Sequence, residues 1–148
     1  MTWELAASIS TVVSSVAVII ALIFGLRQLV EMKRATVLSG YMKIMDILQA
    51  EDVRSARRTV LTTLKDKPLD SWTEAEIVAA EKVCHTFDTV ARLVHFSLCP
   101  KDIVIDNAGD SLRKTWKVLE PFVRSYQLER GKNFWDDYER LAYEARNE

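Results

Sequence analysis

The sequence predicts an all-α protein in which one N-terminal transmembrane helix continues into a cytoplasmic bundle of four to six helices. Three observations support this prediction. Residues 5–26 carry no charge, and later apolar residues recur every three or four positions, as on one face of a helix. Glycine and proline are scarce, with four and three residues, and no alternating pattern typical of strands occurs. We therefore divide the chain into an anchor with its juxtamembrane segment (1–34) and a cytoplasmic helical domain (35–148).

The uncharged stretch has the length of a membrane span. As a helix, its 22 residues would extend about 33 Å, which matches a hydrocarbon core of about 30 Å. Trp3 precedes it at the depth that indole rings prefer, and the basic residues Arg27, Lys33 and Arg34 follow it. The positive-inside rule then places the N-terminus outside and the larger C-terminal part in the cytoplasm. We predict a single-pass protein of the cell inner (plasma) membrane.

The sequence disfavours two other interpretations of this stretch. A helix buried in a soluble core is disfavoured by the length of the uncharged run. A cleaved signal peptide is disfavoured because Glu4 precedes the run, no lysine or arginine does, and no small-x-small cleavage site follows it. The serines and threonine of its first half can bond back to the preceding helical turn, so they are tolerated in a span. The sequence favours an uncleaved anchor.

One face of the predicted span consists of small residues, and we call it the small-residue face. Its members recur at three- and four-residue steps: Ala7, Ser10, Ser14, Ala17, Ala21 and Gly25. Small residues let helices approach closely, and packing drives helix association in lipid. The face predicts self-association or docking on a partner helix, although alanine and serine are also abundant in such segments by chance.

The composition of residues 35–148 excludes one class of partner. This part has 17 basic and 19 acidic residues, a net charge of about −2. Nucleic-acid binders carry a basic excess, so no nucleic-acid partner is expected. Its two cysteines, Cys84 and Cys99, are predicted to lie reduced in the cytosol, and a structural disulfide is not expected.

The first two helices of the domain follow from apolar spacing. An amphipathic extension of the span has apolar residues Val30, Val37, Tyr41, Ile44, Met45 and Leu48. Asp52 is expected to open a second helix, with Arg54, Arg57 and Arg58 on the side opposite its apolar residues. Residues 65–71, which contain Pro68, are predicted to form a loop.

The third helix has the clearest start and stop signals. Thr73 and Glu76 form a capping box, in which each side chain caps the other residue's backbone N–H. The apolar stripe that follows is Ile77, Ala80, Val83, Cys84, Phe87, Val90, Ala91, Val94 and Leu98. Pro100 has no N–H to continue the helix, so it marks the end.

The C-terminal part is predicted to contain several shorter elements. A short piece covers residues 102–105, and Gly109 is expected to break or hinge the chain. Pro121 lies inside the next apolar pattern, which predicts a kink or a new helix start. Gly131 ends that helix, and Asn133 is expected to cap the last one.

The order of these segments resembles a known family. The segments are ARRTVL (56–61), HTFDTVARLV (85–94), GDSLRKTWKVLEPFVRSY (109–126) and FWDDYERLA (134–142). The chain resembles a family of small bacterial membrane-anchored helical proteins known only as a domain of unknown function. The likeness rests on Arg57, Asp88, Gly109, Trp116, Pro121 and Tyr138. It implies the helical fold and the anchor, and it implies no catalytic residue.

The titratable residues suggest little metal chemistry. His95 and Cys99 are four residues apart, but Cys84 lies about 16 Å from His95 along a helix axis, too far for one zinc ion. No metal and no cofactor are therefore expected. The aspartates spaced by four (102, 106 and 110) and the pair at 136 and 137 could hold Mg²⁺ against a diphosphate. Placement in first helical turns, where the helix dipole favours negative charge, explains them more simply.

One ion pair between helices is predicted. Arg57 and Asp88 each lie at the edge of an apolar stripe, and we expect them to face each other. Arg54 and Arg58 could instead contact anionic lipid headgroups.

The sequence predicts a non-catalytic module that binds a protein partner or itself at the cytoplasmic face of the membrane. No P-loop, nucleophile elbow or HExxH motif occurs, so neither an enzyme nor a small-molecule substrate is expected. Trp72, Trp135 and Tyr143 are candidate exposed contacts besides the small-residue face. Two alternatives remain: an accessory subunit of a larger membrane complex, or a helical enzyme or ligand-binder that uses Asp102, Asp106, Asp136 or Asp137.

Overall fold

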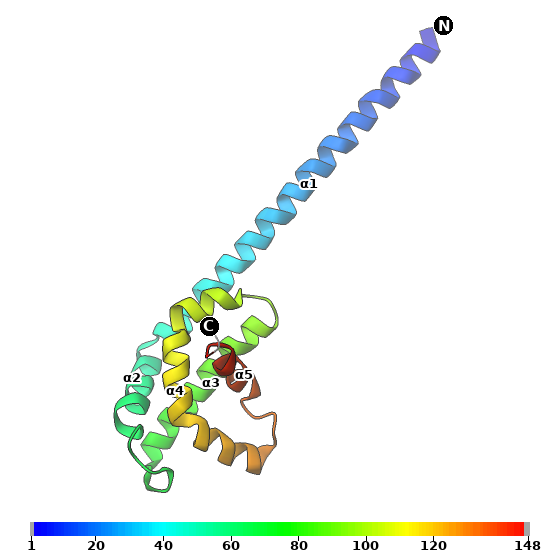
Figure 1. The fold of residues 1–148 in the computed structure, drawn as a ribbon. Coiled ribbons are helices and arrows are strands. Elements are labelled where there is room, and N and C mark those ends of the chain that lie inside the picture. Colours follow the sequence, from blue (N-terminus) through cyan, green and yellow to red (C-terminus); the bar gives the residue numbers. More distant parts are fainter. Residues whose placement is uncertain (1, 147–148) are drawn as a thin grey trace. The chain divides into compact units, whose positions relative to one another are not determined.

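The computed structural model describes residues 2–146, and of residues 2, 5–7 and 11 it describes only the backbone. Within this range all regular secondary structure is helical and no strand is present. Figure 1 shows the α-helices, which are α1 (Thr2–Gln49), α2 (Glu51–Thr59), α3 (Glu74–His95), α4 (Lys101–Arg130) and α5 (Asp136–Glu144). The all-α prediction is confirmed. Contacts divide the chain into two compact units, with the boundary between Thr36 and Val37.

The first unit contains only α1 residues. Within Ser8–Gln49, α1 has a stretch that is long and apolar enough to cross a membrane, and none of that stretch is buried inside the protein. This finding concerns length and composition, which a signal sequence or the core helix of a soluble protein can share.

The second unit is a bundle centred on α3, which packs against α2, α4 and α5. α3 is apolar along one full side because its apolar residues recur at helical spacing, and eight residues on it are buried. The largest fully buried side chains of the unit come from α1, from the turn that follows α2, and from α3, α4 and α5: Ile44, Leu64, Phe87, Leu112, Trp116, Leu119 and Tyr138. The bundle therefore has one continuous core.

The last turns of α1 belong to this core through Ile44 and Leu48. Gly40 lets α1 approach the segment after α3, because an added Cβ would overlap the backbone carbonyl oxygen of Leu98. A side chain at this position would force two backbones apart.

The second predicted helix is confirmed, with small differences at its ends. α2 begins at Glu51, one residue before the predicted start, and Asp52 accepts a hydrogen bond from the Val53 N–H at 2.9 Å. The helix continues into a π-helical turn, Val60–Leu64. Most of the predicted loop is irregular, but it includes a short 3₁₀ turn, Leu69–Ser71.

The capping box at the start of α3 is confirmed. The Glu76 N–H donates to Thr73 Oγ1 at 3.4 Å, and the Thr73 N–H donates to Glu76 Oε2 at 2.7 Å. Lys67 also binds this carboxylate and holds the pKa of Glu76 at about 2. The helix ends at His95, before the stop predicted at Pro100, and Ser97 then takes a positive φ of 57°.

α4 corrects the predicted division of residues 101–130. One helix runs through the expected short piece, through Gly109 and through Pro121, so a break at Gly109 and a new helix start near Pro121 are wrong. The helix does bend, because its yellow-green first turns and its yellow middle part run in different directions (Figure 1). Glycine costs a helix only about 1 kcal/mol, and this one is buried where a Cβ would lie 3.2 Å from Ile105 Cγ2. The glycine thus serves close packing. The ribbon changes direction toward its orange C-terminal part (Figure 1).

The start of α5 also differs from the prediction. Gly131 ends α4 with a φ of 110°, as predicted, but Asn133 does not cap α5. Trp135 precedes the first residue of α5 with a left-handed φ of 57° and ψ of 31°. Trp135 is 3% exposed and its ring stacks on Tyr126 with ring centroids 5.1 Å apart, so this candidate is not an exposed contact.

Candidate functional site

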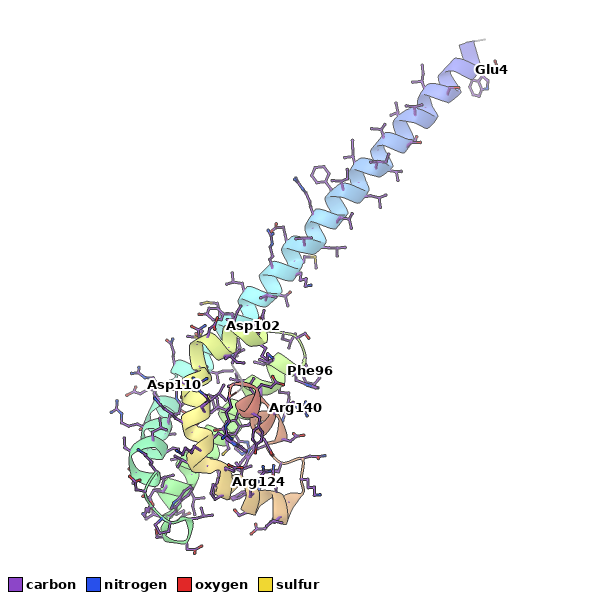
Figure 2. The ribbon with its side chains drawn as sticks, viewed as in Figure 1. Glu4, Phe96, Asp102, Asp110, Arg124 and Arg140 are labelled. Atoms are coloured by element: carbon purple, nitrogen blue, oxygen red, sulfur yellow. The ribbon has the colours of Figure 1, made fainter. Side chains whose placement is uncertain are left out.

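The predicted membrane span presents apolar side chains on every side of α1. Figure 2 shows side chains projecting all around this helix, and the large apolar residues of the stretch are 49–64% exposed. They include Val12, Val13, Val16, Val18, Ile19, Ile20, Leu22, Ile23, Phe24 and Leu26. A helix that is apolar all round needs an apolar environment, because water disfavours each such side chain.

The small-residue face lies on the same part of α1. The side chains of Ser10, Ser14, Ala17 and Ala21 are exposed, and a Cβ added at Gly25 would meet nothing within 4 Å. The side chain of Ala7 lies outside the described residues. Backbones can therefore approach closely along this face in the part of α1 that is described.

Polar and aromatic residues flank the apolar stretch. Trp3 is 82% exposed. Arg27, Lys33 and Arg34 are exposed beyond the other end, and Arg34 pairs with Glu31 at 3.2 Å. This arrangement is typical of the two interfaces of a membrane span.

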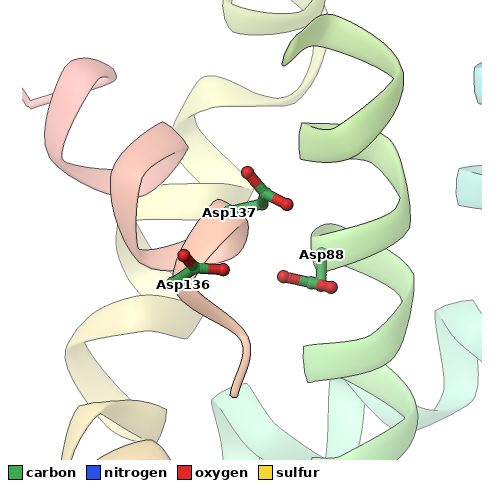
Figure 3. A group of neighbouring side chains, drawn as sticks. All are labelled: Asp88, Asp136 and Asp137. Carbon is green, nitrogen blue, oxygen red and sulfur yellow. The ribbon is translucent and has the colours of Figure 1, made fainter. Parts of the chain in front are cut away.

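The bundle contains a second feature, three carboxylates that meet where α5 begins (Figure 3). Asp88 comes from the middle of α3, and Asp136 and Asp137 are the first two residues of α5. One oxygen of each lies within 4.8 Å of the others. We call these residues the aspartate cluster.

Two arginines form ion pairs with the aspartate cluster. Arg92 binds Asp88 at 2.7 Å and approaches Asp137 at 3.6 Å. Arg140, labelled in Figure 2, lies 3.8 Å from Asp137 and 3.9 Å from Asp136. Paired carboxylates of this kind are explained by the protein's own cations, without an added metal ion.

Asp88 has a structural task in this cluster. Asp88 Oδ1 accepts a hydrogen bond from the Tyr138 N–H at 3.2 Å, which is one of the free N–H groups in the first turn of α5. No side chain next to α5 in the sequence caps it. Asp88 therefore caps α5 from another helix, at a separation of 50 residues.

The protonation of Asp88 should change the stability of the bundle. Its carboxyl is 6% exposed, and this burial raises its pKa above the ordinary value of 3.8, against the opposing effects of the Tyr138 N–H and Arg92. The folded state then holds the proton more tightly than the unfolded chain. The stability that Asp88 contributes is full below pH 3.8 and is lost as the pH rises through the raised pKa.

We therefore expect the stability difference between the wild type and Asp88→Asn to shift with pH. Asparagine keeps an acceptor for the Tyr138 N–H but does not titrate. The unfolding free energy of the wild type minus that of the variant should fall as the pH rises from below 3.8 toward neutrality. Urea unfolding of the full chain, followed by tryptophan fluorescence at several pH values, measures this. A constant or rising difference would contradict the role assigned to burial.

The predicted pair between Arg57 and Asp88 does not form. Arg57 Nη2 donates to the Leu48 carbonyl at 2.7 Å, and its other nitrogen lies 3.5 Å from Ser111 Oγ. Arg57 thus fastens the end of α1 to α2 and α4, while Asp88 faces α5. The prediction failed because spacing places both residues at the edge of a stripe but does not say which neighbour each edge faces.

The other candidate metal-ligating residues of the sequence do not come together in one site. Among the residues described with side chains, only the aspartate cluster gathers three potential metal ligands, so Asp102 and Asp106 join no such group with Asp136 and Asp137. Figure 2 labels Asp102 near the start of α4. Cys84 and Cys99 are free and buried, as predicted for core residues. His95 lies 3.2 Å from Arg140 and belongs to the surface network.

Reasoning from sequence missed Asp88 as a partner of Asp136 and Asp137. The signal was present, because an aspartate inside an apolar helical stripe needs a buried partner. Trp72 and Tyr143 were predicted as exposed contacts. Trp72 is only partly buried and packs on Phe122 at 5.4 Å between ring centroids, and Tyr143 is 38% exposed.

Comparison with known proteins gives one match. The model of a family described as "Domain of unknown function (DUF4760)" matches residues 14–145. No curated protein and no solved structure matches the chain.

Proposed function

We propose that this chain, which belongs to the DUF4760 family, is a single-pass, non-catalytic, membrane-anchored helical module that binds a protein partner or a second copy of itself at the cytoplasmic face. The observation that carries the proposal is the exposed apolar surface of α1 over 22 uncharged residues. Burying such a surface in lipid is favourable by about 25 cal/mol per Å².

The orientation is supported by charge. Arg27, Lys33 and Arg34 all follow the apolar stretch, and only Glu4 is charged before it. Basic residues close to a span favour the cytoplasmic side, so the N-terminus lies outside and the bundle lies in the cytoplasm. The membrane is then the inner (plasma) membrane.

The partner-binding surface is the small-residue face. Its exposed members can pack against another helix with little loss of side-chain entropy, because alanine and glycine have none to lose. The same face would serve a homo-oligomer or docking on the helices of a larger complex. An accessory subunit is therefore the second form of the same proposal.

Ala17→Leu should weaken this association. The larger side chain separates the helix backbones, at a cost of about 1 kcal/mol, which is roughly fivefold in the association constant. Ser15→Leu is the matched control, because Ser15 lies about 200° around the helix from Ala17 and receives the same side chain. Crosslinking in native membranes, followed by detergent extraction and mass spectrometry, measures the yield of each complex.

The outcomes separate the forms of the proposal. The proposal is supported if Ala17→Leu lowers the yield of the crosslinked complex and Ser15→Leu does not. The mass spectrum then shows whether that complex is a homo-oligomer or a larger assembly with other proteins. Equal yields from both variants would remove the small-residue face as the binding surface. Recovery of the wild-type chain in the soluble fraction without detergent would overturn the anchor.

A further inference from the structure

The bundle has a cavity that the proposed function does not use. Its volume is about 740 Å³, inside the range of about 300–1,000 Å³ that small-molecule sites occupy. Its walls come from the π-helical turn after α2, the loop before α3 and the middle of α4. The apolar part of the lining includes Leu61, Leu64, Leu69, Trp72, Val118 and Pro121.

The polar part of the lining is mainly cationic. Lys65, Lys67, Lys114 and Lys117 line the cavity together with one carboxylate, Asp66. Long lysine side chains can lay their methylene groups along an apolar wall and keep the ammonium group at its edge. The cavity is therefore apolar inside and positively charged among its polar groups.

Two of these lysines are already paired. Lys67 binds Glu76 at 2.7 Å, and Lys114 binds Asp110 at 2.7 Å. Within the described part of the chain, Lys65 and Lys117 have no ion pair. Both are exposed, so neither is required by the core.

The net charge of the cavity lining, once the two paired lysines are set aside, indicates the charge of the ligand. With Lys67 and Lys114 balanced, Lys65 and Lys117 oppose only Asp66, which leaves one net positive charge at the cavity. A single anionic head group would balance this charge, and an apolar body would cover the leucines and Trp72. A neutral or cationic ligand would leave the two ammonium groups without a partner.

We propose that this cavity binds a single-chain amphiphile with one anionic head group, such as a carboxylate, held by Lys65 and Lys117. The head group accepts charge-assisted hydrogen bonds from the two ammonium groups. The chain lies against the apolar lining. This site lies entirely within the bundle and is independent of whether the small-residue face associates.

Equilibrium dialysis of labelled octanoate tests the proposal. The full chain is held in phosphatidylcholine nanodiscs, with empty nanodiscs as the blank, or in buffer if it proves soluble. We expect saturable binding of about one octanoate per chain. The double variant Lys65→Gln with Lys117→Gln should weaken it at least about fivefold, because it removes both charged donors.

Lys43→Gln with Lys132→Gln is the matched control. It removes the same charge from two exposed lysines that do not line the cavity. Octanol and octylammonium test the head group, and both should bind at least about fivefold more weakly than octanoate. Unchanged binding in the cavity variant, an equal loss in the control variant, or equally tight binding of octanol would overturn the proposal. So would the absence of saturable octanoate binding.

The location of the ligand is tested on the wild type by lysine acetylation. Octanoate should protect Lys65 and Lys117 and leave the acetylation of Lys43 and Lys132 unchanged. Protection of all four lysines alike would place the ligand elsewhere and overturn the assignment.

Discussion

Substituting arginine for two apolar residues in the middle of α1 should release the chain from the membrane. The variant is Val16→Arg with Ile19→Arg, at positions that are 50% and 56% exposed. Each arginine near the centre of a span costs about 2.5–3.5 kcal/mol of insertion free energy, so the pair costs roughly 5–7 kcal/mol. We expect most of the double variant in the soluble or aggregated fraction, and the wild type in carbonate-washed membranes.

Val16→Leu with Ile19→Leu is the control for this variant, because it changes shape without adding charge. It should fractionate as the wild type does. Neither position contributes to the core of the bundle, so circular dichroism of the released arginine variant should still report a folded helical domain. Retention of the arginine variant in washed membranes at the wild-type level would contradict the anchor.

Tyr138→Ala should destabilise the bundle more than any other single truncation considered. Tyr138 is fully buried, stacks on Phe87 at 5.3 Å and meets Trp116 edge to face at 5.0 Å between ring centroids. Truncating a buried aromatic side chain costs about 3–5 kcal/mol. A domain of this size has about 5–15 kcal/mol in total, so the urea midpoint of the full chain should fall by a large fraction.

Two variants separate packing from hydrogen bonding at this position. The Tyr138 hydroxyl lies 2.9 Å from Thr115 Oγ1, which also bonds to the Ser111 carbonyl at 2.7 Å. Tyr138→Phe leaves Thr115 with that partner and should cost only about 1 kcal/mol. Tyr143→Ala, on the same helix but 38% exposed, should also cost about 1 kcal/mol or less. Equal costs for Tyr138→Ala and Tyr143→Ala would contradict the assigned core.

The parts of the fold that could be predicted from sequence are those set by local interactions. The capping box of Thr73 and Glu76 involves residues three apart, and the apolar stripe of α3 repeats every helical turn. Cys84 could be assigned to the core because it lies on that stripe. The positive φ of Gly131 is likewise a property of one residue and its neighbours.

The parts that could not be predicted depend on contacts between distant segments. Gly109 carries a strong local signal for a break, but burial within α4 outweighs the small cost of a glycine in a helix. Trp135 lies in a polar stretch of sequence, yet the turn before α5 folds its ring onto Tyr126. Local sequence patterns do not show these tertiary contacts.

The candidate sites also differ in whether they depend on local sequence or on contacts between distant segments. The apolar surface of α1 follows directly from a contiguous run of residues. The aspartate cluster joins Asp88 to a pair about 50 residues later, and the cavity joins Lys65 to Lys117 across a similar separation. Each lysine alone resembles an ordinary exposed lysine, and only the fold brings them to one cavity.

The capping of α5 by Asp88 has a consequence for the order of assembly. α5 has nine residues, too few for an isolated helix to be stable in water, and its cap belongs to α3. The helix can therefore form only on a surface that α3 already provides. Because Tyr138, Leu141 and Ala142 reach the core from α5, the core of the bundle stays open until α5 has packed. During synthesis, the core can therefore close only after α5 has left the ribosome.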